Sequence, residues 1–352
     1  MTARRHLRVV ICSGGRRVYI VRWFREAFAK LDVTGEVVVL DADAAAPAGQ
    51  AADVFRQVPR VTDPLYRAAI CEIVTELQPD LFLSLHDYEL EVLSDGLAAD
   101  LRSDRTAVLS LTNDAQLVAG DKWLLASRLD PAYSTPTLRA SDHAAVAALV
   151  AANDRVVVKH RYGSASSGLS IVSGDDVHAA VARATVDAPR PMSASSTDTP
   201  EDWVVVQPCV RGTEYGMDAV FSVHGSHGGV PRGVSARRKL RMRAGETDQA
   251  VTVDPAPFQG VAGAIGALLE PRGLVDVDVI VDDAGRSHVI DINPRFGGGY
   301  PFTHLSGVDV PAFYLAEVLG FPEPEKHLAG LPGVMSAKYE EITAVLTTDG
   351  RP

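Results

Sequence analysis

The chain has 352 residues, of which 46% are hydrophobic and 22% are charged, and its formal net charge is −11. This length predicts two or three domains, and the acidic balance argues against a nucleic-acid-binding protein, which would normally carry a basic face. Three widely spaced cysteines without a CxxC pair indicate reduced thiols, and no apolar run approaches the roughly 20 residues of a membrane helix. Because the charged N-terminus is followed by only a short apolar strand, we expect no signal peptide and a cytoplasmic protein.

The first 112 residues alternate between strand and helix patterns. Predicted strands cover 7–12, 36–43, 54–59, 80–89 and 107–112, and predicted helices cover 18–31 and 68–78. Strands that alternate with helices indicate a parallel α/β domain. The glycine turn after the first strand lacks the GxGxxG spacing of a dinucleotide site, so we expect Arg16 and Arg17 to face a substrate cleft or to pack at a domain junction.

A different order of elements begins at Asn113. We expect helices over 113–129, 142–152 and 257–270, strands over 155–161, 203–210 and 215–223, and a hairpin of 275–283 with 288–293. Asn113 or Asp114 is expected to cap the first of these helices, and the strand over 215–223 is expected to pair with the strand over 203–210. The stretch 187–202 is rich in Ser, Thr and Pro and is predicted to be a flexible excursion.

The segment VIDINPRFGGGYP, residues 289–301, carries polar side chains at two-residue intervals. Side chains alternate between the two faces of a strand, so Asp291, Asn293 and Arg295 are expected to share one face. The preceding turn would bring Asp278 close to Asp291, and two carboxylates with a carboxamide suit Mg²⁺. The alternative is a solvated polar strand face.

Three glycines follow this arginine, at 297–299, and we expect them to let a substrate approach the backbone. His304 and Asp87 are further candidates for contact with an acceptor. For each of the two, a structural role is the favoured alternative.

Lysine is rare in this chain, with six lysines among 34 basic residues. A lysine inside an apolar segment is therefore expected to be there for its compact ammonium group. Lys159 ends the apolar run VVVK, and a loop of small residues from Gly163 to Gly168 follows it. The backbone N–H groups of such a loop suit a phosphate, although the Walker A order is absent and similar loops are common between strands.

The strand over 203–210 breaks at Gln207 and Pro208. Such a break leaves backbone groups free to bind an adenine edge, and the carboxylate of Glu214 follows within reach of a ribose. By spacing alone, Glu214 would be a surface acid.

The run 235–247 places four cations, Arg237, Lys239, Arg241 and Arg243, on one predicted strand face. A solvated basic face is the ordinary interpretation of such a run. Opposite two metal-binding acids, however, a cationic strip suits a triphosphate and an anionic substrate.

In this order, six segments resemble the ATP-grasp superfamily, and in particular its carbamoyl-phosphate-synthase-like carboxylate–amine ligases. They are GDKWLLASRL, VVVKHRYGSASSGLSIV, VVVQPCVRGTEYGMD, RRKLRMRAGET, VDVDVIVDD and VIDINPRFGGGYP. The N-terminal ICSGGRRVYIVRWFREAF is similar to the domain that precedes the grasp in this branch. The resemblance implies an α/β ATP-grasp fold with four parts: a Rossmann-like domain over 1–112, a small lid over 113–205, a catalytic subdomain over 206–330 and a tail strand over 331–352.

The resemblance also implies a reaction in which ATP phosphorylates a substrate carboxylate and an amine then displaces the phosphate. The implied nucleotide-binding residues are Lys122, Lys159, Gly163, Ser166, Ser167 and Gly168 for the phosphates, Gln207 and Val210 for adenine, and Glu214 for the ribose. The implied ligands of one or two Mg²⁺ ions, for which Mn²⁺ would be a substitute, are Asp278, Asp291 and Asn293. The implied catalytic cations are Arg295, Lys239 and Arg241, which would counter the charge of the transferred phosphoryl group.

The chain departs from the family pattern at the metal positions, where the family often has glutamates, and at Gln207, where an acid is frequent. We expect the substrates to be a small carboxylic acid or amino acid and an amine, with no nucleic-acid or membrane partner, and a homodimer as the default assembly. One alternative is a kinase-like enzyme whose phosphate is not passed to an amine. Another is a nucleotide-binding protein with a degenerate site.

Overall fold

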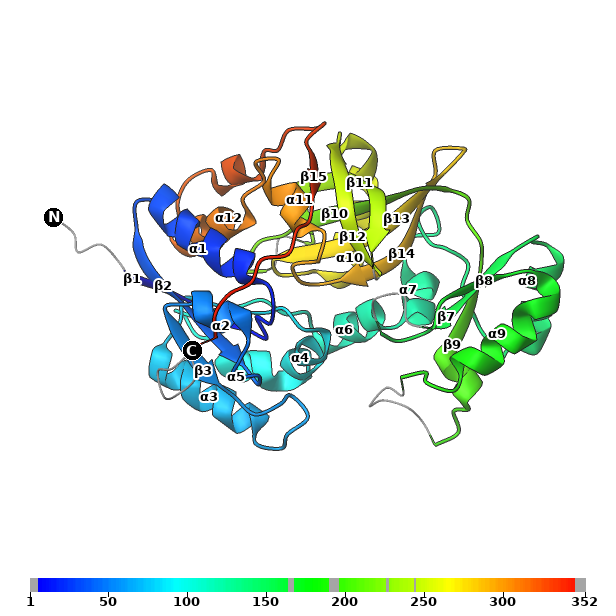
Figure 1. The fold of residues 1–352 in the computed structure, drawn as a ribbon, viewed down its shortest axis with the longest axis horizontal. Coiled ribbons are helices and arrows are strands. Elements are labelled where there is room, and N and C mark those ends of the chain that lie inside the picture. Colours follow the sequence, from blue (N-terminus) through cyan, green and yellow to red (C-terminus); the bar gives the residue numbers. More distant parts are fainter. Residues whose placement is uncertain (1–5, 164–167, 190–195, 226–227, 244, 346–352) are drawn as a thin grey trace.

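The computed structural model describes residues 6–163, 168–189, 196–225, 228–243 and 245–345, and these residues form three β-sheets (Figure 1). One sheet belongs to the N-terminal domain, one to a small lid and one to the largest, catalytic part. The predicted phosphate-loop residues Ser166 and Ser167 lie outside the described residues.

The N-terminal sheet has five parallel strands in the order β3-β2-β1-β4-β5. The strands are β1 (His6–Cys12), β2 (Thr34–Asp41), β3 (Val54–Gln57), β4 (Leu81–Ser84) and β5 (Ala107–Val108), and the helices are α1 (Val18–Lys30), α2 (Pro47–Ala51), α3 (Tyr66–Leu77), α4 (Asp87–Val92) and α5 (Ala98–Leu101), with a π-helical turn over Leu93–Leu97. The central strand β1 is apolar from Val9 to Cys12 because both of its faces are covered there: Val9 and Ile11 pack toward α1, whereas Val10 and Cys12 pack toward α3.

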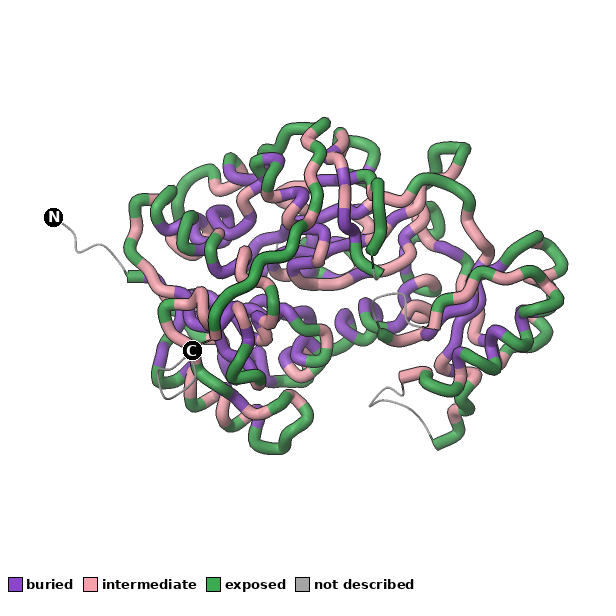
Figure 2. Tube along the Cα trace, viewed as in Figure 1, coloured by how far each residue is buried: buried purple, intermediate pink, exposed green. Residues whose placement is uncertain are grey.

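The catalytic sheet has six antiparallel strands in the order β14-β13-β10-β11-β12-β15. Its strands are β10 (Gly212–Val220), β11 (Gly233–Arg243), β12 (Glu246–Val253), β13 (Leu274–Asp282), β14 (Ser287–Asn293) and β15 (Met335–Ala337). The helices α6 (Asn113–Gly120), α7 (Lys122–Arg128) and α10 (Gln259–Leu269) share one apolar core with this sheet. The helices α11 (Tyr300–His304) and α12 (Val310–Val318) instead join the core of the N-terminal domain, so the two parts are packed together (Figures 1 and 2).

The lid sheet has four antiparallel strands in the order β6-β9-β7-β8 and lies at one end of the molecule (Figure 1). Its elements are β6 (Leu138–Arg139), α8 (His143–Ala151), β7 (Val156–His160), β8 (Ser170–Val172), α9 (Val177–Ala184) and β9 (Val204–Pro208). The expected boundary between 205 and 206 falls inside β9, and the expected lid residues 113–129 pack on the catalytic sheet. The lid sheet and its helices therefore run from β6 to β9.

Several predicted elements differ from the observed ones. The predicted helix over 113–129 is two helices, and Thr112, not Asn113 or Asp114, caps the first by accepting a hydrogen bond from the backbone N–H of Ala115. The segment 80–89 was predicted as a strand that runs into a polar turn; the strand ends at Ser84, and α4 begins at Asp87 where the turn was expected. The segment predicted over 215–223 belongs to β10, which pairs with β11 and β13 and not with β9.

Candidate active site

A cavity of about 820 Å³ lies between the N-terminal domain, the lid and the catalytic sheet. Its walls come from the loop after β4 and from α4, from the C-terminal half of α6, from the loop after β7 and from strands β11 to β14. Ligand pockets usually have volumes of about 300–1,000 Å³, so this cavity is large enough for a nucleotide or another ligand of similar size.

Two carboxylates face each other on the catalytic sheet at the base of this cavity. Asp278 of β13 and Asp291 of β14 are partners in the strand register, and Asp276 is the partner of Asn293 in the same way. All four side chains line the cavity. Burial raises the pKa of Asp278, the carboxylates of Asp276 and Asp291 raise it further, and the resulting pKa is about 6 even though Lys239 lies beside it.

A β-bulge at Ile290 changes which side chains of β14 point to the core and which to the cavity. The register passes from Asp291 opposite Asp278 to Val289 opposite Val279, so Ile290 is the extra residue. Because of the bulge, Val289 and Ile292 both reach the apolar core although they are three residues apart. The backbone carbonyl of Ile290 accepts a hydrogen bond of 3.1 Å from the Lys159 ammonium.

Lys159 is buried at the end of β7, and it does not belong to the cavity wall itself. Burial lowers the pKa of its ammonium, the nearby charge of Lys122 lowers it further, and the resulting pKa is about 8. Lys159 approaches the acidic strand from the lid side through its hydrogen bond to the Ile290 carbonyl.

Lys122 begins α7 and connects the lid with the acidic strand. Its Nζ donates a hydrogen bond of 2.7 Å to the carbonyl of Gly163 and lies 3.3 Å from Asp291 Oδ1. Asp121 fixes this position, because it caps α7 and also forms two hydrogen bonds, of 2.6 and 2.8 Å, with the guanidinium of Arg161 at the end of β7. The interruption between α6 and α7 thus places an ammonium group in the cavity.

The cations of β11 do not all face the cavity. Arg237 is buried between Asp218 and Asp276, and Lys239 contacts both Glu214, at 2.6 Å, and Asp278, at 2.7 Å. After Lys239 the strand contains a bulge, which disrupts the alternation of side chains.

The next cation after the bulge, Arg241, instead donates a hydrogen bond of 2.6 Å to Asp248, its side chain is 60% exposed, and Met242 lines the cavity in its place. The structure therefore brings Lys239 to the candidate site and does not bring Arg241 there. Arg243 lies 3.6 Å from Glu340 near the C-terminal end of the described chain.

Arg295 lies where the chain leaves β14 and is almost completely buried. It forms two hydrogen bonds, of 2.6 and 2.8 Å, with the carboxylate of Asp87 at the start of α4. Burial by itself would raise the pKa of Asp87, but these bonds from Arg295 outweigh burial, so the pKa is below its ordinary value. The sequence did not predict this pair, which joins the catalytic sheet to the N-terminal domain.

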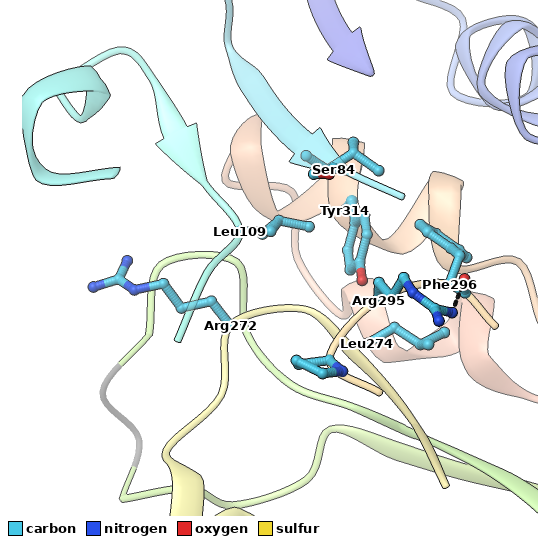
Figure 3. A pocket seen from close by; sticks show the side chains of 9 residues that line it. Ser84, Leu109, Arg272, Leu274, Arg295, Phe296 and Tyr314 are labelled. Atoms are coloured by element: carbon cyan, nitrogen blue, oxygen red, sulfur yellow. Dashed lines mark hydrogen bonds between the residues drawn. The ribbon is translucent and has the colours of Figure 1, made fainter. Parts of the chain in front are cut away.

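Figure 3 shows Arg295 from the side of a second, very small pocket, beside Phe296, Tyr314 and Leu274. The dashed line is the hydrogen bond of 3.3 Å that Arg295 donates to the carbonyl of Phe296. This pocket has a volume of about 10 Å³, no more than one water molecule requires. This second pocket is therefore too small for a substrate, and the large cavity is the candidate site.

The residues predicted to bind adenine and ribose lie apart from the cavity wall. Gln207 is buried in β9 and donates a hydrogen bond of 2.6 Å to Thr137, Val210 lies in the connection from β9 to β10, and the Glu214 carboxylate contacts Lys239. Of the described phosphate-loop glycines, Gly163 lines the cavity and Gly168 packs against the ring of His160; both have positive φ angles, +96° and +65°.

The glycines after Arg295 are explained mainly by packing. A Cβ atom on Gly297 would lie 2.1 Å from the carboxylate of Asp276, and one on Gly299 would lie 2.2 Å from the guanidinium of Arg237. Only at Gly298, which lines the cavity, would the nearest atom be at 3.5 Å. The expectation that these glycines serve substrate approach is thus too general, because two of them make room for a buried ion pair.

The remaining candidates from the sequence are distributed as follows. His304 stacks on Trp23 with a ring-centroid distance of 3.9 Å, and burial lowers its pKa to about 4, so it is a neutral packing residue. Arg16 is exposed, whereas Arg17 lines the cavity. Asp276 lines the cavity without having been predicted to do so, although its two-residue spacing from Asp278 was a usable signal. Arg237, predicted as part of the cationic strip, also lines the cavity.

The donor atoms on the acidic face fit a hard cation such as Mg²⁺. Asp278, Asp291 and Asn293 offer only oxygen ligands from side chains, and Asp278 has a raised pKa, which a cation would reverse. Within the described parts of the chain there is no group of three or more His, Cys, Asp or Glu side chains arranged to hold a metal. The protein would therefore supply two carboxylates and one amide, and phosphate or water oxygens would complete the shell.

Two family patterns match the chain. The PylC-like N-terminal domain matches residues 9–102, and the ATP-grasp domain matches residues 119–299. Because the second match covers just over half of the 352 residues, the chain belongs to the ATP-grasp family. This membership confirms the predicted fold class, α/β ATP-grasp with an N-terminal parallel-sheet domain, and the predicted enzyme class, an ATP-using ligase.

Solved structures share the fold. The biotin carboxylase domain of 2-oxoglutarate carboxylase from Hydrogenobacter thermophilus superposes with a TM-score of 0.67 at 14% identity, over 92% of this chain and 72% of that one. N5-carboxyaminoimidazole synthetase from Staphylococcus aureus superposes with a TM-score of 0.62 at 13% sequence identity, over 94% of this chain and 80% of that one. L-amino acid ligase from Bacillus licheniformis superposes with a TM-score of 0.61 at 16% sequence identity, over 94% of this chain and 76% of that one. No curated protein matches the sequence.

In the described ranges, no helix is both long enough and apolar enough to span a membrane.

Proposed function

We propose that this protein is an ATP-dependent carboxylate–amine ligase that acts on a small carboxylic acid or amino acid. ATP would phosphorylate the carboxylate of one substrate, and the nitrogen of an amine would then attack the acyl carbon and release phosphate. The observation that carries the proposal is the pair of facing carboxylates, Asp278 and Asp291, beside Asn293 and Arg295 on the wall of one cavity. This arrangement suits the charge stabilisation that phosphoryl transfer requires.

The acidic face would hold one or two Mg²⁺ ions through Asp278, Asp291 and Asn293, and the cation would neutralise phosphate charge. Lys122 and Lys159 would contact the phosphates, because both ammonium groups approach the acidic strand from the lid. Their present contacts with Asp291 and with the Ile290 carbonyl would be exchanged in part for phosphate oxygens. Mn²⁺ has the same preference for oxygen ligands and would be a substitute.

Lys239 and Arg295 would stabilise the charge that develops on the transferred phosphoryl group and the acyl phosphate. Both are buried cations at the edge of the cavity, and each is already held by carboxylates. Groups that are fixed before the reaction need little reorganisation during it, and this gives them their catalytic value. The partly exposed Asp87 carboxylate would be the residue that fixes Arg295.

The adenine and ribose would lie on the lid side of the acidic face, near Gln207, Val210 and Glu214. In support of this placement, Glu214 and Asp278 share Lys239 as their partner, so a nucleotide whose phosphates lie on Asp278 has the Glu214 carboxylate within reach. Gly163, which lines the cavity, would lie close to the phosphates.

Two solved structures with the same fold support this function. One was determined with magnesium ADP and bicarbonate bound, and another is an L-amino acid ligase. The three cysteines are free thiols in the structure, which supports a cytoplasmic location, and a homodimer stays the default assembly.

The test is release of ADP and phosphate during incubation of the purified protein with ATP, Mg²⁺ and the standard amino acids, singly and in pairs. A ligase requires an acid and an amine together for full turnover and gives an amide detectable by mass spectrometry. ADP release with an acid alone, accompanied by an acyl phosphate that hydroxylamine traps, would support the kinase-like alternative. Binding of ATP without any turnover would support the nucleotide-binding alternative.

A further inference from the structure

Arg17 differs from the other cations that line the cavity. The cationic side chains in the described wall are Arg17, Lys122, Arg237, Lys239 and Arg295. Four of them, all except Arg17, lie within salt-bridge distance of a carboxylate. Among the described residues, Arg17 has no carboxylate within that distance.

The backbone holds the Arg17 guanidinium in place. Arg17 immediately precedes α1, and one of its terminal nitrogens donates hydrogen bonds of 3.0 Å to the carbonyls of Leu85 and Phe296. Arg295 donates to the same Phe296 carbonyl at 3.3 Å. The two guanidinium groups are therefore neighbours that share one acceptor, and the other N–H groups of Arg17 have no partner within the described chain.

Arg17 has no direct ion-pair partner of its own among the described residues, although carboxylates lie farther away. Arg17 and Arg295 contribute two positive charges, and Asp87 contributes one negative charge through its paired hydrogen bonds with Arg295. Burial lowers the pKa of Arg17, and the positive charge of Arg295 lowers it further. The charges of Asp87 and Asp276 oppose this shift, but Asp87 is paired with Arg295 and Asp276 with Arg237. An anion that enters the cavity would therefore be the first direct ion-pair partner of Arg17.

We propose that Arg17 binds the carboxylate of the acid substrate and presents it, together with Arg295, to the phosphoryl donor. The proposal rests on the ligase function proposed above. The planar edge of a guanidinium matches a carboxylate in two parallel hydrogen bonds, and the free N–H groups of Arg17 provide such an edge. The N-terminal domain would thus supply a substrate-binding residue and not only a scaffold.

A carboxylate fits this position better than a phosphate of ATP. The two lysines proposed for the phosphates approach from the lid, through contacts with Gly163 and Ile290. Arg17 and Asp87 come from the opposite wall, in the N-terminal domain. The acid would therefore lie between Arg17 and the acidic face, with its carboxylate oxygen directed toward the phosphates.

The kinetic test compares Arg17→Met with Arg16→Met, a matched change at the exposed neighbour, using the acid found in the amino-acid screen. Loss of a charged hydrogen-bonding group should raise KM for the acid about 30-fold in Arg17→Met, equivalent to about 2 kcal/mol. KM for ATP should change by less than about twofold, and Arg16→Met should behave as the wild type. An increase confined to KM for ATP, or no change in either constant, would overturn the proposal.

A labelling test on the wild-type protein keeps the proposal open to refutation if Arg17→Met does not fold or if the screen yields no substrate. Phenylglyoxal modifies accessible guanidinium groups, and fragment masses distinguish Arg16 from Arg17. Acetate should protect Arg17 from modification, whereas neutral acetamide should not, and Arg16 should be modified equally in both. Equal protection by the two compounds, or none by acetate, would contradict a carboxylate subsite. Protection by acetate without any ligase turnover would retain the subsite while the ligase function fails.

Discussion

Two strands of the catalytic sheet, β14 and β11, show how the same kind of sequence pattern leads to different outcomes. In both, charged or polar residues recur at every second position, which predicts that they share a face. In β14 the bulge lies at Ile290, before the polar residues, so Asp291 and Asn293 remain in phase. In β11 the bulge lies between Lys239 and Arg241, within the charged run, so the phase is lost.

The comparison shows that alternation predicts a shared face only between bulges. Nothing in the spacing of charges distinguishes RRKLRMR from VIDINPR, because a bulge depends on the partner strand as well as on the strand itself. The consequence for function is direct: β14 contributes its predicted polar set to the cavity, whereas β11 contributes Lys239 and Arg237 but not Arg241. The predictions that follow test this difference.

The largest effect is expected for Asp291→Asn on β14. The substitution keeps the shape of the side chain but removes the negative charge that would hold Mg²⁺ opposite Asp278. We expect turnover to fall by a factor on the order of 10³ or more, with a weaker apparent affinity for Mg²⁺ and an unchanged melting temperature. ADP release measured against Mg²⁺ concentration checks this, and an unchanged Mg²⁺ dependence would reject the metal assignment.

A comparable effect is expected for Arg295→Lys, which continues the same face. Lysine cannot reproduce the paired hydrogen bonds to Asp87, so its ammonium will not be held in the position of the guanidinium. We expect kcat to fall by a factor on the order of 10³ while ATP binding is retained. Single-turnover kinetics measure the chemical step, and equilibrium binding measures the affinity for ATP. A mild effect on kcat would assign Arg295 to a packing role.

A smaller effect, and the sharpest contrast, is expected on β11. Lys239→Met removes the cation beside Asp278 and should lower kcat/KM about 10²-fold. Arg241→Met removes an exposed cation beyond the bulge and should change kcat/KM less than about twofold. Because the ion pair with Asp248 is also lost, the free energy of unfolding should fall by at most about 1 kcal/mol. Steady-state assays of both variants make the comparison, and equal losses would show that the bulge does not separate their roles.

The smallest effect concerns pH and the lysine that contacts the bulge of β14. The ammonium form of Lys159 predominates below its pKa of about 8 and is lost as the pH rises above that value. We therefore expect kcat/KM for ATP to decline by up to about tenfold per pH unit above pH 8. In Lys159→Arg, whose guanidinium stays charged, the alkaline decline should move to higher pH; if its profile matches the wild type, another group titrates.

Much of the fold could be predicted from the sequence, because its elements have strong apolar periodicity. The run LRVVIC and the alternating VDVDVIVDD became β1 and β13 close to their predicted bounds. The predictions failed where tertiary contacts decide. Asp121 interrupts an otherwise helical pattern because its carboxylate binds Arg161, 40 residues later, and caps α7 at the same time.

The candidate site was predictable in composition but not in its long-range pairs. The acids and lysines that line the cavity were chosen from spacing and from the family resemblance, and Lys122, Asp278, Asp291 and Asn293 lie around one cavity. The pair of Arg295 with Asp87 joins residues 208 positions apart, and no local pattern indicates which acid an arginine will contact. For the same reason, the unmatched charge of Arg17 became visible only when the partners of all its neighbours were known.

The three glycines after Arg295 divide the sequence positions around the site into fixed and adjustable ones. Residues 297 and 299 are closed to any side chain by the ion pair beneath them, whereas a Cβ atom at residue 298, on the cavity wall, would make only ordinary contacts, with Lys338 Nζ nearest at 3.5 Å. A library restricted to residue 298 would therefore reshape the acid-binding wall without disturbing Asp276 or Arg237. Directed evolution of substrate choice in this scaffold has its most economical starting point at that one codon.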